Sequence, residues 1–219
     1  MRTLVIATRN PHKLEEIRAV LGADLRCLTL RDLPDAPEIV EDGATFAENA
    51  RKKAVGLAQW LAARPAAGRP PGVCWVLADD SGLEVDALHG APGVHSARFA
   101  AAEVGASGNA PDAANNARLL RLLRGVPPER RAARFRCVIA VAPVGETASA
   151  PAAARLFEGA CEGRILEAPR GGAGFGYDPL FQPGGHDRTF AELGAAVKNR
   201  ISHRARALAR MAAWWHGGK

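Results

Sequence analysis

Short apolar runs alternate with amphipathic stretches along this chain, and one of each lies at its start. The compact apolar run 3–7 predicts a buried strand. Helix-start chemistry follows at once, because Asn10 can cap a helix and Pro11 suits its first position. Apolar residues then recur at helical spacing until Gly22 ends the element. The chain therefore opens with a strand, a turn and a helix.

The same patterns predict elements further along the chain. A Thr-Phe-Ala-Glu capping box at 45–48 opens a helix that runs to about Ala63, and the Pro- and Gly-rich residues 64–72 follow as a surface loop. The apolar run 73–78 predicts a strand that ends at Asp79. The other expected elements are a half-buried strand at 83–88, a helix at 112–124, strands at 135–141 and 155–162, a glycine-rich turn at 171–178, and a final helix with Ile201, Ala205, Leu208, Ala212 and Trp215 on one face.

Strands that alternate with helices predict an α/β layered fold. No internal repeat or linker divides the 219 residues, so we expect a single domain over 1–219. Folds of this class collect ligands at the carboxyl ends of strands, where helices begin. Three segments with candidate chemistry share that position in the expected fold: 8–13, 79–81 and 174–178.

Composition narrows the class of protein. No apolar run approaches the roughly 18 residues of a membrane span, and the first apolar stretch is too short for a signal peptide, so we expect a cytoplasmic protein with no membrane partner. The four cysteines form no Cys-x-x-Cys pair, which argues against a zinc site. The net charge of +6 fits phosphate ligands or solvated basic faces, and without interleaved aromatics we expect no dedicated nucleic-acid binding.

Two adjacent carboxylates, Asp79 and Asp80, are the first candidate site, and Ser81 and Gly82 follow them. Proteins commonly hold Mg²⁺ with one or two carboxylates together with substrate phosphates, so a strand end of this kind suggests nucleotide chemistry. A simple turn explains the same residues, because Asp, Ser and Gly all favour turns. Glu41 could add a second acid to the same metal, or could be an exposed loop acid.

Residues 8–13, Thr-Arg-Asn-Pro-His-Lys, lie at the first strand-to-helix turn. Backbone N–H groups at a helix start favour an anion and Lys13 adds a point charge, so this turn is a candidate triphosphate cradle. It is not a Walker A motif, because the glycine spacing is missing. An ordinary capped helix with an exposed lysine explains it equally well. Lys53, on the helical face of Phe46, could reach the phosphates or be solvated.

The segment 174–179, Gly-Phe-Gly-Tyr-Asp-Pro, combines a permissive backbone with two aromatic rings. The rings could stack on a base, although a tight turn with both rings in the core fits as well. Lys198, His203 and Arg204 near the start of the last helix supply donors for a base carbonyl and charge for a phosphate. These signals share one ligand, a purine nucleoside triphosphate with Mg²⁺.

Six blocks of the sequence form a recognisable series. They are Thr-x-Asn-x-x-Lys at 8–13, Thr-Phe-x-Glu-Asn-Ala at 45–50 with Lys53, Ala-Asp-Asp-Ser-Gly-Leu at 78–83, Ala-Pro-Gly-Val-x-Ser-Ala-Arg at 91–98, Gly-Phe-Gly-Tyr-Asp-Pro at 174–179, and Ile-Ser-His-Arg at 201–204. In this order they resemble the inosine/xanthosine triphosphate pyrophosphatase family, from about Val5 to Leu208. Six blocks in register are far more specific than any one of them.

The resemblance implies a Mg²⁺-dependent hydrolase that converts ITP, dITP, XTP and dXTP to the monophosphate and pyrophosphate, and so removes deaminated purines from the nucleotide pool. It also implies an elongated mixed sheet flanked by helices, two lobes with the active-site cleft between them, and a homodimer. By the same resemblance Asp80 is the catalytic carboxylate and a metal ligand, and Glu41 is the second ligand. The implied substrate-binding residues are Thr8, Arg9, Asn10, Pro11, His12, Lys13, Lys53, Ser81, Phe175, Gly176, Tyr177, Asp178, Lys198, His203 and Arg204.

Two alternative functions stay open at this point. A pyrophosphatase for pyrimidine or modified nucleotides would have the same kind of fold and site, and a panel of substrates separates it from a purine enzyme. A non-catalytic nucleotide-binding protein would bind without Mg²⁺-dependent turnover. The presence of Asp79, Asp80 and Lys13 argues against a dead enzyme.

Overall fold

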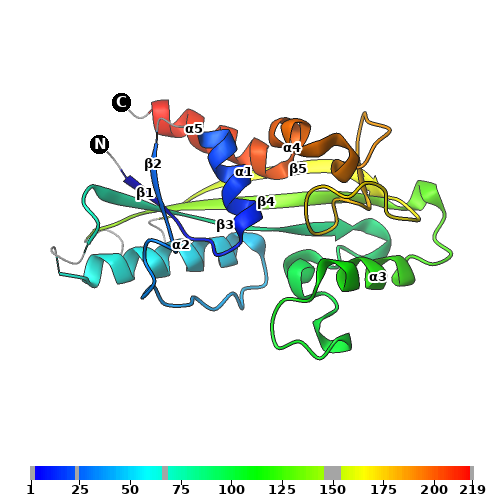
Figure 1. The fold of residues 1–219 in the computed structure, drawn as a ribbon, viewed down its shortest axis with the longest axis horizontal. Helices are drawn as coiled ribbons and strands as arrows, with labels where there is room; N and C mark the ends of the chain where they lie inside the picture. The colour runs from blue at the N-terminus through cyan, green and yellow to red at the C-terminus, as the bar shows by residue number, and fades with distance from the viewer. Residues whose placement is uncertain (1–2, 23–24, 66–68, 146–153, 218–219) are drawn as a thin grey trace. The chain divides into compact units, whose positions relative to one another are not determined.

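A six-stranded mixed sheet organises the part of the chain that the computed structural model describes, residues 3–22, 25–65, 69–145 and 154–217. The strand order is β2-β1-β3-β4-β5-β6 (Figure 1). β1 runs parallel to both β2 and β3, whereas β5 and β6 are antiparallel. The strands are β1 (Thr3–Ile6), β2 (Arg26–Thr29), β3 (Val73–Val85), β4 (Ala132–Pro143), β5 (Arg155–Ile165) and β6 (Phe181–Pro183). The predicted α/β class is therefore confirmed.

The α-helices of the described residues begin where local chemistry favours a helix start. They are α1 (Pro11–Leu21), α2 (Phe46–Ala63), α3 (Asp112–Leu122), α4 (Phe190–Ile201) and α5 (His203–Gly217). In α1, the Asn10 side chain accepts hydrogen bonds from the N–H groups of His12 and Lys13, and Gly22 ends the helix with φ of 71°. In α4, Thr189 and Glu192 form a reciprocal capping box. None of these helices is long and apolar enough to cross a lipid bilayer.

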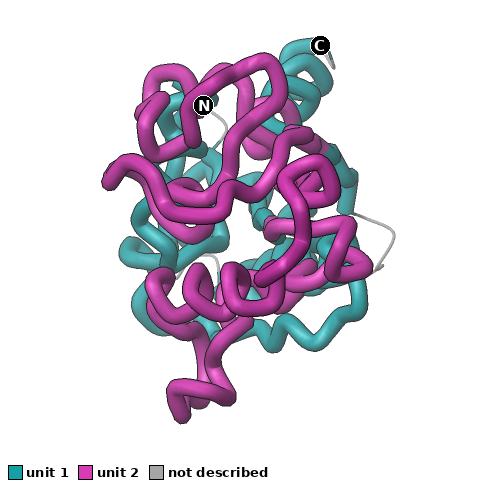
Figure 2. The backbone as a smooth tube through the Cα atoms, turned by 90° about the vertical axis from the view of Figure 1, so that its right-hand side faces the viewer, with its two compact units in different colours: residues 1–80, 137–158, 207–219 teal, residues 81–136, 159–206 magenta. Residues whose placement is uncertain are grey.

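The chain divides into two compact units, drawn in teal and magenta in Figure 2. The first unit contains residues 1–80, 137–158 and 207–219, and the second contains 81–136 and 159–206. Three strands, β3, β4 and β5, contribute residues to both units. Each unit is described below by itself.

Each unit has its own apolar core. In the first unit, Ile6 of β1, Ile17 of α1 and Leu77 of β3 pack with Leu208 and Met211 of α5. The core of the second unit contains aromatic side chains of β4, β6 and α4 together with leucines and a valine of β3 and α3; among its members are Leu83, Val85, Leu119, Leu123, Phe135, Phe181 and Phe190. The two ends of β3 thus contribute apolar side chains to different cores.

β3 corrects one prediction, because it does not end at Asp79. The expected strands at 73–78 and 83–88 are a single strand that continues through both aspartates and ends at Val85, followed by a 3₁₀ turn. The alternative prediction of a turn at 79–82 is wrong for the same reason. Asp and Ser favour turns when their side chains bond the local backbone, whereas here these side chains bond distant residues and β3 is hydrogen-bonded to its neighbours in the sheet.

Other elements differ from prediction in smaller ways. Three elements were not expected: β2, β6 and α4. β2 and β6 are strands of only four and three residues, and Gly194, with φ of 76°, interrupts the helical pattern of α4. The final helix starts at His203, because Ser202 is extended and caps α4. The capping box of α2 is half formed: Thr45 accepts from the Glu48 N–H, whereas the Glu48 carboxylate accepts from Ala44.

Candidate active site

The carboxylates of Asp79 and Asp80 are buried in the middle of β3, with exposed fractions of 1% and 7%. β1 ends at Ile6, and the N–H of Ala7 donates to the carbonyl of Leu77 at 2.7 Å. Beyond that point, side chains of α1 and α2 become partners of β3. The charged pair is therefore buried within β3, just beyond the end of β1, and the prediction that the strand ends there is wrong.

Lysines from two helices surround this part of β3. The Nζ atom of Lys13 lies 3.2 Å from Oδ2 of Asp79. The Nζ atom of Lys53 lies 3.0 Å from the Asp79 carbonyl oxygen and 2.8 Å from Oε1 of Glu41. The structure thus brings the predicted Lys13, Lys53 and Glu41 to the acidic pair within the first unit.

Asn49 of α2 connects Asp80 to the loop before that helix. Its Nδ2 donates to Oδ2 of Asp80 at 3.1 Å, and its Oδ1 accepts from the Gly43 N–H at 2.7 Å. A Cβ on Gly43 would lie 2.7 Å from the same Oδ1, so the loop comes this close only because residue 43 is glycine. Asn49 belonged to one of the sequence blocks, but nothing local indicated that it bonds a carboxylate.

Burial raises the pKa of Asp80 above its usual range, and the charge of Glu41 raises it further. The nearby Lys13 and Lys53 and the amide of Asn49 oppose that shift. A carboxylate whose ionised form is costly gains most from an additional cation. The buried carboxylate of Asp80 and the partly exposed carboxylate of Glu41 together supply oxygen ligands of the kind that a hard cation such as Mg²⁺ prefers.

The described residues contain no group of three or more His, Cys, Asp or Glu side chains that could hold a metal ion by themselves. This agrees with the way Mg²⁺ is usually bound, through one or two protein carboxylates, water and substrate phosphates. Asp80 and Glu41 are the candidate ligands, and Lys53 lies between Glu41 and the backbone of Asp79.

The turn at 8–13 closes largely on itself. Thr8 accepts from the Asn10 N–H at 3.2 Å, and Asn10 accepts from the N–H groups of His12 and Lys13 at 2.9 and 3.2 Å. The expectation of free N–H groups at this helix start is therefore wrong at those two positions, because the predicted cap already uses them. Lys13 still provides positive charge beside the acidic pair.

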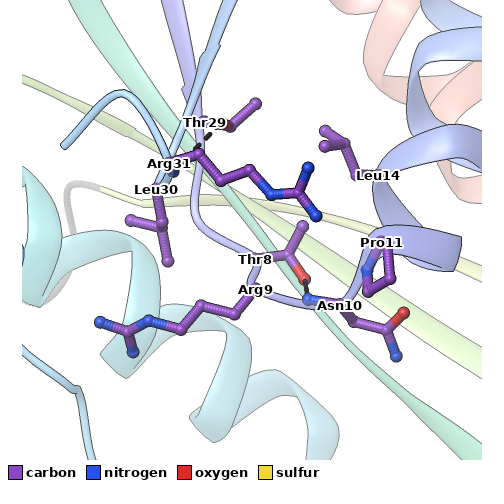
Figure 3. A pocket seen from close by; sticks show the side chains of 8 residues that line it. All are labelled: Thr8, Arg9, Asn10, Pro11, Leu14, Thr29, Leu30 and Arg31. Carbon is purple, nitrogen blue, oxygen red and sulfur yellow. Dashed lines mark hydrogen bonds between the residues drawn. The ribbon is translucent and has the colours of Figure 1, made fainter. Parts of the chain in front are cut away.

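A cavity of about 250 Å³ adjoins this turn (Figure 3). Its lining comes from the turn, from the start of α1 and from the end of β2: Thr8, Arg9, Asn10, Pro11, Leu14, Thr29, Leu30 and Arg31. In Figure 3 the Arg31 side chain extends toward Pro11 and Leu14, and the Arg9 guanidinium points away from Asn10. Arg9 donates to the Ala36 carbonyl at 3.2 Å.

In the second unit, Phe175 and Lys198 come together at the glycine-rich turn. The Nζ atom of Lys198 lies 4.3 Å from the centroid of the Phe175 ring and 2.5 Å from Oδ2 of Asp178. That oxygen also accepts from the Phe175 N–H at 3.0 Å. Gly174 has φ of 80°, and a Cβ there would lie 2.2 Å from the same Oδ2. The turn therefore holds a half-buried ring against a buried ammonium group.

Tyr177 lies in the core of the second unit, unlike Phe175. Its hydroxyl donates to the carbonyl of Ser96 at 2.9 Å, and burial raises its pKa. Ser96 itself accepts from the Leu83 N–H and donates to the Gly93 carbonyl. The structure thus gives Tyr177 a supporting position, and Phe175 alone of the two residues is partly exposed.

The residues at the start of α5 are buried. Arg204 is 1% exposed, and its Nη2 donates to Oγ of Ser81 at 2.7 Å. Its guanidinium carbon lies 6.0 Å from the centroid of Phe175. The ring of His203 stacks on Phe135 of β4, with centroids 4.8 Å apart and planes 13° from parallel. Sequence reasoning missed Phe135, which carries no local signal beyond that of a buried strand residue.

Comparison with known proteins supports the resemblance. The model of the Ham1 family matches residues 4–214. A protein of Opitutus terrae named dITP/XTP pyrophosphatase is 49% identical over 218 residues, which cover 96% of this chain and 97% of that protein. A protein of the same name from Geobacillus kaustophilus is 47% identical over 225 residues, which cover 100% of this chain and 98% of that protein.

Solved structures agree with the sequence relatives. The structure of a HAM1 protein from Coxiella burnetii is similar to this chain with a TM-score of 0.80 and 36% identity, covering 99% of this chain and 100% of that one. A nucleoside-triphosphatase, dITP/XTP pyrophosphatase, from Mycobacterium abscessus has a TM-score of 0.67 and 38% identity, covering 95% and 98%.

Proposed function

This chain belongs to the Ham1 family, and we propose that it hydrolyses dITP and XTP to the monophosphate and pyrophosphate. The observation that carries the proposal is identity of 46–50% to several curated proteins of that name over at least 94% of this chain. The structure supports it with a buried carboxylate, Asp80, among lysines, as a metal and phosphate site needs.

The phosphate end of the substrate belongs to residues of the first unit. Asp80 and Glu41 would hold Mg²⁺, and Lys13 and Lys53 would add positive charge toward the triphosphate. Further contacts come from the turn Thr8, Arg9, Asn10, Pro11 and His12. A bound Mg²⁺ supplies charge against the phosphate oxygens and makes a bound water more acidic. A carboxylate of this site then takes the proton of the attacking water.

The base end belongs to residues of the second unit. The face of Phe175 stacks on the purine, and Gly176, Tyr177 and Asp178 keep the turn in place. Lys198, His203, Arg204 and Ser81 are the polar groups around it; Ser81 accepts from Arg204 and follows Asp80 directly in β3.

We expect the enzyme to distinguish dITP and XTP from adenine nucleotides by the group at position 6 of the purine. Inosine and xanthine carry a carbonyl there, which accepts a hydrogen bond from a donor such as His203 or Arg204. Adenine carries an amino group that would leave this donor unpaired. A site built on such a bond discriminates by about four orders of magnitude. We therefore expect ATP and dATP to be poor substrates.

Pyrophosphate release from dITP tests the reaction, measured with and without Mg²⁺ beside dATP, dGTP, dTTP and dUTP. We expect rapid release from dITP and not from dATP, only with Mg²⁺, and its loss in Asp80→Asn. Guanine also carries a 6-carbonyl, so dGTP measures whether another part of the base is recognised. Asp86→Asn is the matched control. It is the same Asp-to-Asn substitution, but at an exposed residue that pairs with Arg134. Orthophosphate as product, or equal turnover of all substrates, would reject the proposal.

The homodimer and the cytoplasmic location remain predictions of the resemblance and of the sequence. Light scattering after size exclusion tests the first: a mass near twice 23.1 kDa is expected, and a single-chain mass at micromolar protein would contradict it.

A further inference from the structure

One helix binds both backbone polar groups of Gly176. Oδ2 of Asp112, the first residue of α3, accepts from the Gly176 N–H at 2.6 Å. One turn further along α3, Nδ2 of Asn116 donates to the Gly176 carbonyl at 3.0 Å. Residues four apart lie on the same helix face, so the two side chains reach one peptide segment together.

Gly176 is the point at which this support matters most. It has φ of 61°, in the left-handed region, and separates the half-buried Phe175 from the core residue Tyr177. On the far side of Phe175, residues 171–174 are exposed. The position of the Phe175 ring thus depends on Asp178 and Lys198 on one side and on the Gly176 backbone on the other.

We propose that Asp112 and Asn116 are positioning residues for base binding, which rests on the proposed function of this site. They hold the Gly176 backbone, and through it the Phe175 ring, in the orientation that a purine stacks on. Neither residue lies in any of the six sequence blocks. Their effect is on nucleotide affinity, because a misplaced ring weakens stacking without changing the metal and phosphate groups.

Asp112 is placed to serve the turn and not its own helix. The residue before it, Pro111, occupies the N-cap position of α3, where no side-chain cap bond is formed. An aspartate at the N-cap commonly bonds the N–H groups of the first turn, but Asp112 lies one residue beyond the N-cap. Here its carboxylate bonds the N–H of a residue 64 positions later in the chain.

Asn116 fixes the other polar group of the Gly176 backbone, its carbonyl. Its Nδ2 points at the Gly176 carbonyl, and its Oδ1 is buried and has no hydrogen-bond partner among the described residues. A buried acceptor without a partner costs free energy, so the Asn116 amide is retained here at some cost to stability.

α3 has enough other anchors to remain folded without Asp112. Asn115 is buried and bonds Ala97, Ala100 and Ala110, and Arg118 donates to the Phe99 carbonyl. Leu119 is fully buried in the core of the second unit. Substitution of the exposed Asp112 therefore releases the turn and leaves the helix in place.

The test compares Asp112→Ala with Asp112→Asn, which keeps an oxygen acceptor for the Gly176 N–H. Two quantities are measured: the steady-state constants for dITP, and the dissociation constant of dIMP by calorimetry without metal. We expect Asp112→Ala to raise KM and the dIMP dissociation constant about tenfold, with kcat within about twofold. Asp112→Asn should restore both to within about threefold of the wild type.

Glu103→Ala is the matched control, because it also removes an exposed acid that bonds α3, through Arg121, but touches no residue of the turn. We expect no change in either constant. Asn116→Ser is the second variant; it removes the donor to the Gly176 carbonyl and should weaken dIMP binding about threefold. The Mg²⁺ concentration for half activation should stay the same in all variants.

Unchanged dIMP binding in folded Asp112→Ala would overturn the inference, as would a fall in kcat with KM unchanged. Failure of Asp112→Asn to restore binding would also overturn it, because the acceptor oxygen would then be irrelevant. A wild-type protein that binds dIMP but releases no pyrophosphate from dITP would instead reject the proposed function alone.

Discussion

The two groups of candidate site residues are built on different physical principles. In the first unit, Asp79, Asp80, Lys13, Lys53 and Glu41 form a cluster of charges in which each lysine contacts an acid or the strand backbone. In the second unit, a turn held by backbone hydrogen bonds presents one aromatic ring beside a buried lysine. The first group is stabilised by charge pairing, and the second by the exact placement of a ring.

The difference matches what we propose that each group recognises, phosphates in the first unit and the base in the second. Phosphates are identical in every nucleoside triphosphate, so a cluster of charges and a metal ion binds them without regard to the base. A base is recognised by its shape and by its hydrogen bonds, which demand fixed geometry. Substitutions in the first group should therefore stop turnover of any substrate, and substitutions in the second should change KM and selectivity.

The largest expected effect is at Asp80. Asp80→Asn should lower kcat/KM by about a thousandfold, because in the proposed site it removes the charge that would hold the metal. The melting temperature of the metal-free protein should not fall: burial makes the ionised carboxylate costly, and an asparagine oxygen can still accept from Asn49. Thermal unfolding and pyrophosphate release measured together check this. A variant that is both active and Mg²⁺-dependent would remove Asp80 from the catalytic role.

Gly174→Ala should have the next largest effect, and only on the base side. The new Cβ would both adopt a left-handed conformation and meet the Asp178 carboxylate that Lys198 and Phe175 share. We expect KM for dITP to rise by about thirtyfold with half activation by Mg²⁺ unchanged, since strain and displacement together cost roughly 2 kcal/mol.

Gly185→Ala controls for backbone strain. Gly185 has φ of 78°, close to that of Gly174, but a Cβ there meets no atom within 4 Å. It should lower stability without changing KM. If both variants raised KM equally, the clash with Asp178 would not be the cause.

Phe175→Ala should raise KM by about tenfold and leave kcat nearly unchanged, by analogy with the roughly 1–3 kcal/mol that a stacked base contributes. Phe157→Ala is a suitable control, because Phe157 packs on Trp214 in the first unit and should affect the melting temperature only. An unchanged KM in Phe175→Ala would mean that its ring serves the fold and not the base.

The smallest expected effect is at Phe135, on which the ring of His203 stacks. Phe135→Leu removes the stacked ring and should lower the preference for dITP over dATP by about threefold, since aromatic stacking contributes roughly 0.5–1.5 kcal/mol. The ratio of kcat/KM for the two substrates measures it. A loss of stability with an unchanged ratio would assign Phe135 to the core alone.

Several features of the fold could be predicted because their causes lie within a few residues. Asn10 caps α1 and Gly22 ends it as expected, since a cap acts over one helical turn. The α2 boundaries also agree, although the carboxylate of Glu48 bonds Ala44 and not Thr45. The short β2 and β6 gave no periodic signal because strands of three or four residues are too short to show one.

The sequence by itself determined the family, the α/β class and the residue types of the candidate site, because ordered blocks and local periodicity are properties of the chain. Tertiary structure alone decided how those residues are used. It made residues 79–82 part of a strand of the sheet, supplied Lys13 and Asn49 as partners of the two aspartates, and paired Arg204 with Ser81 across 123 positions. It also buried Tyr177 and left Phe175 partly exposed. The reason is physical: a buried polar group must find a partner, and that partner comes from wherever the fold brings one within hydrogen-bond distance.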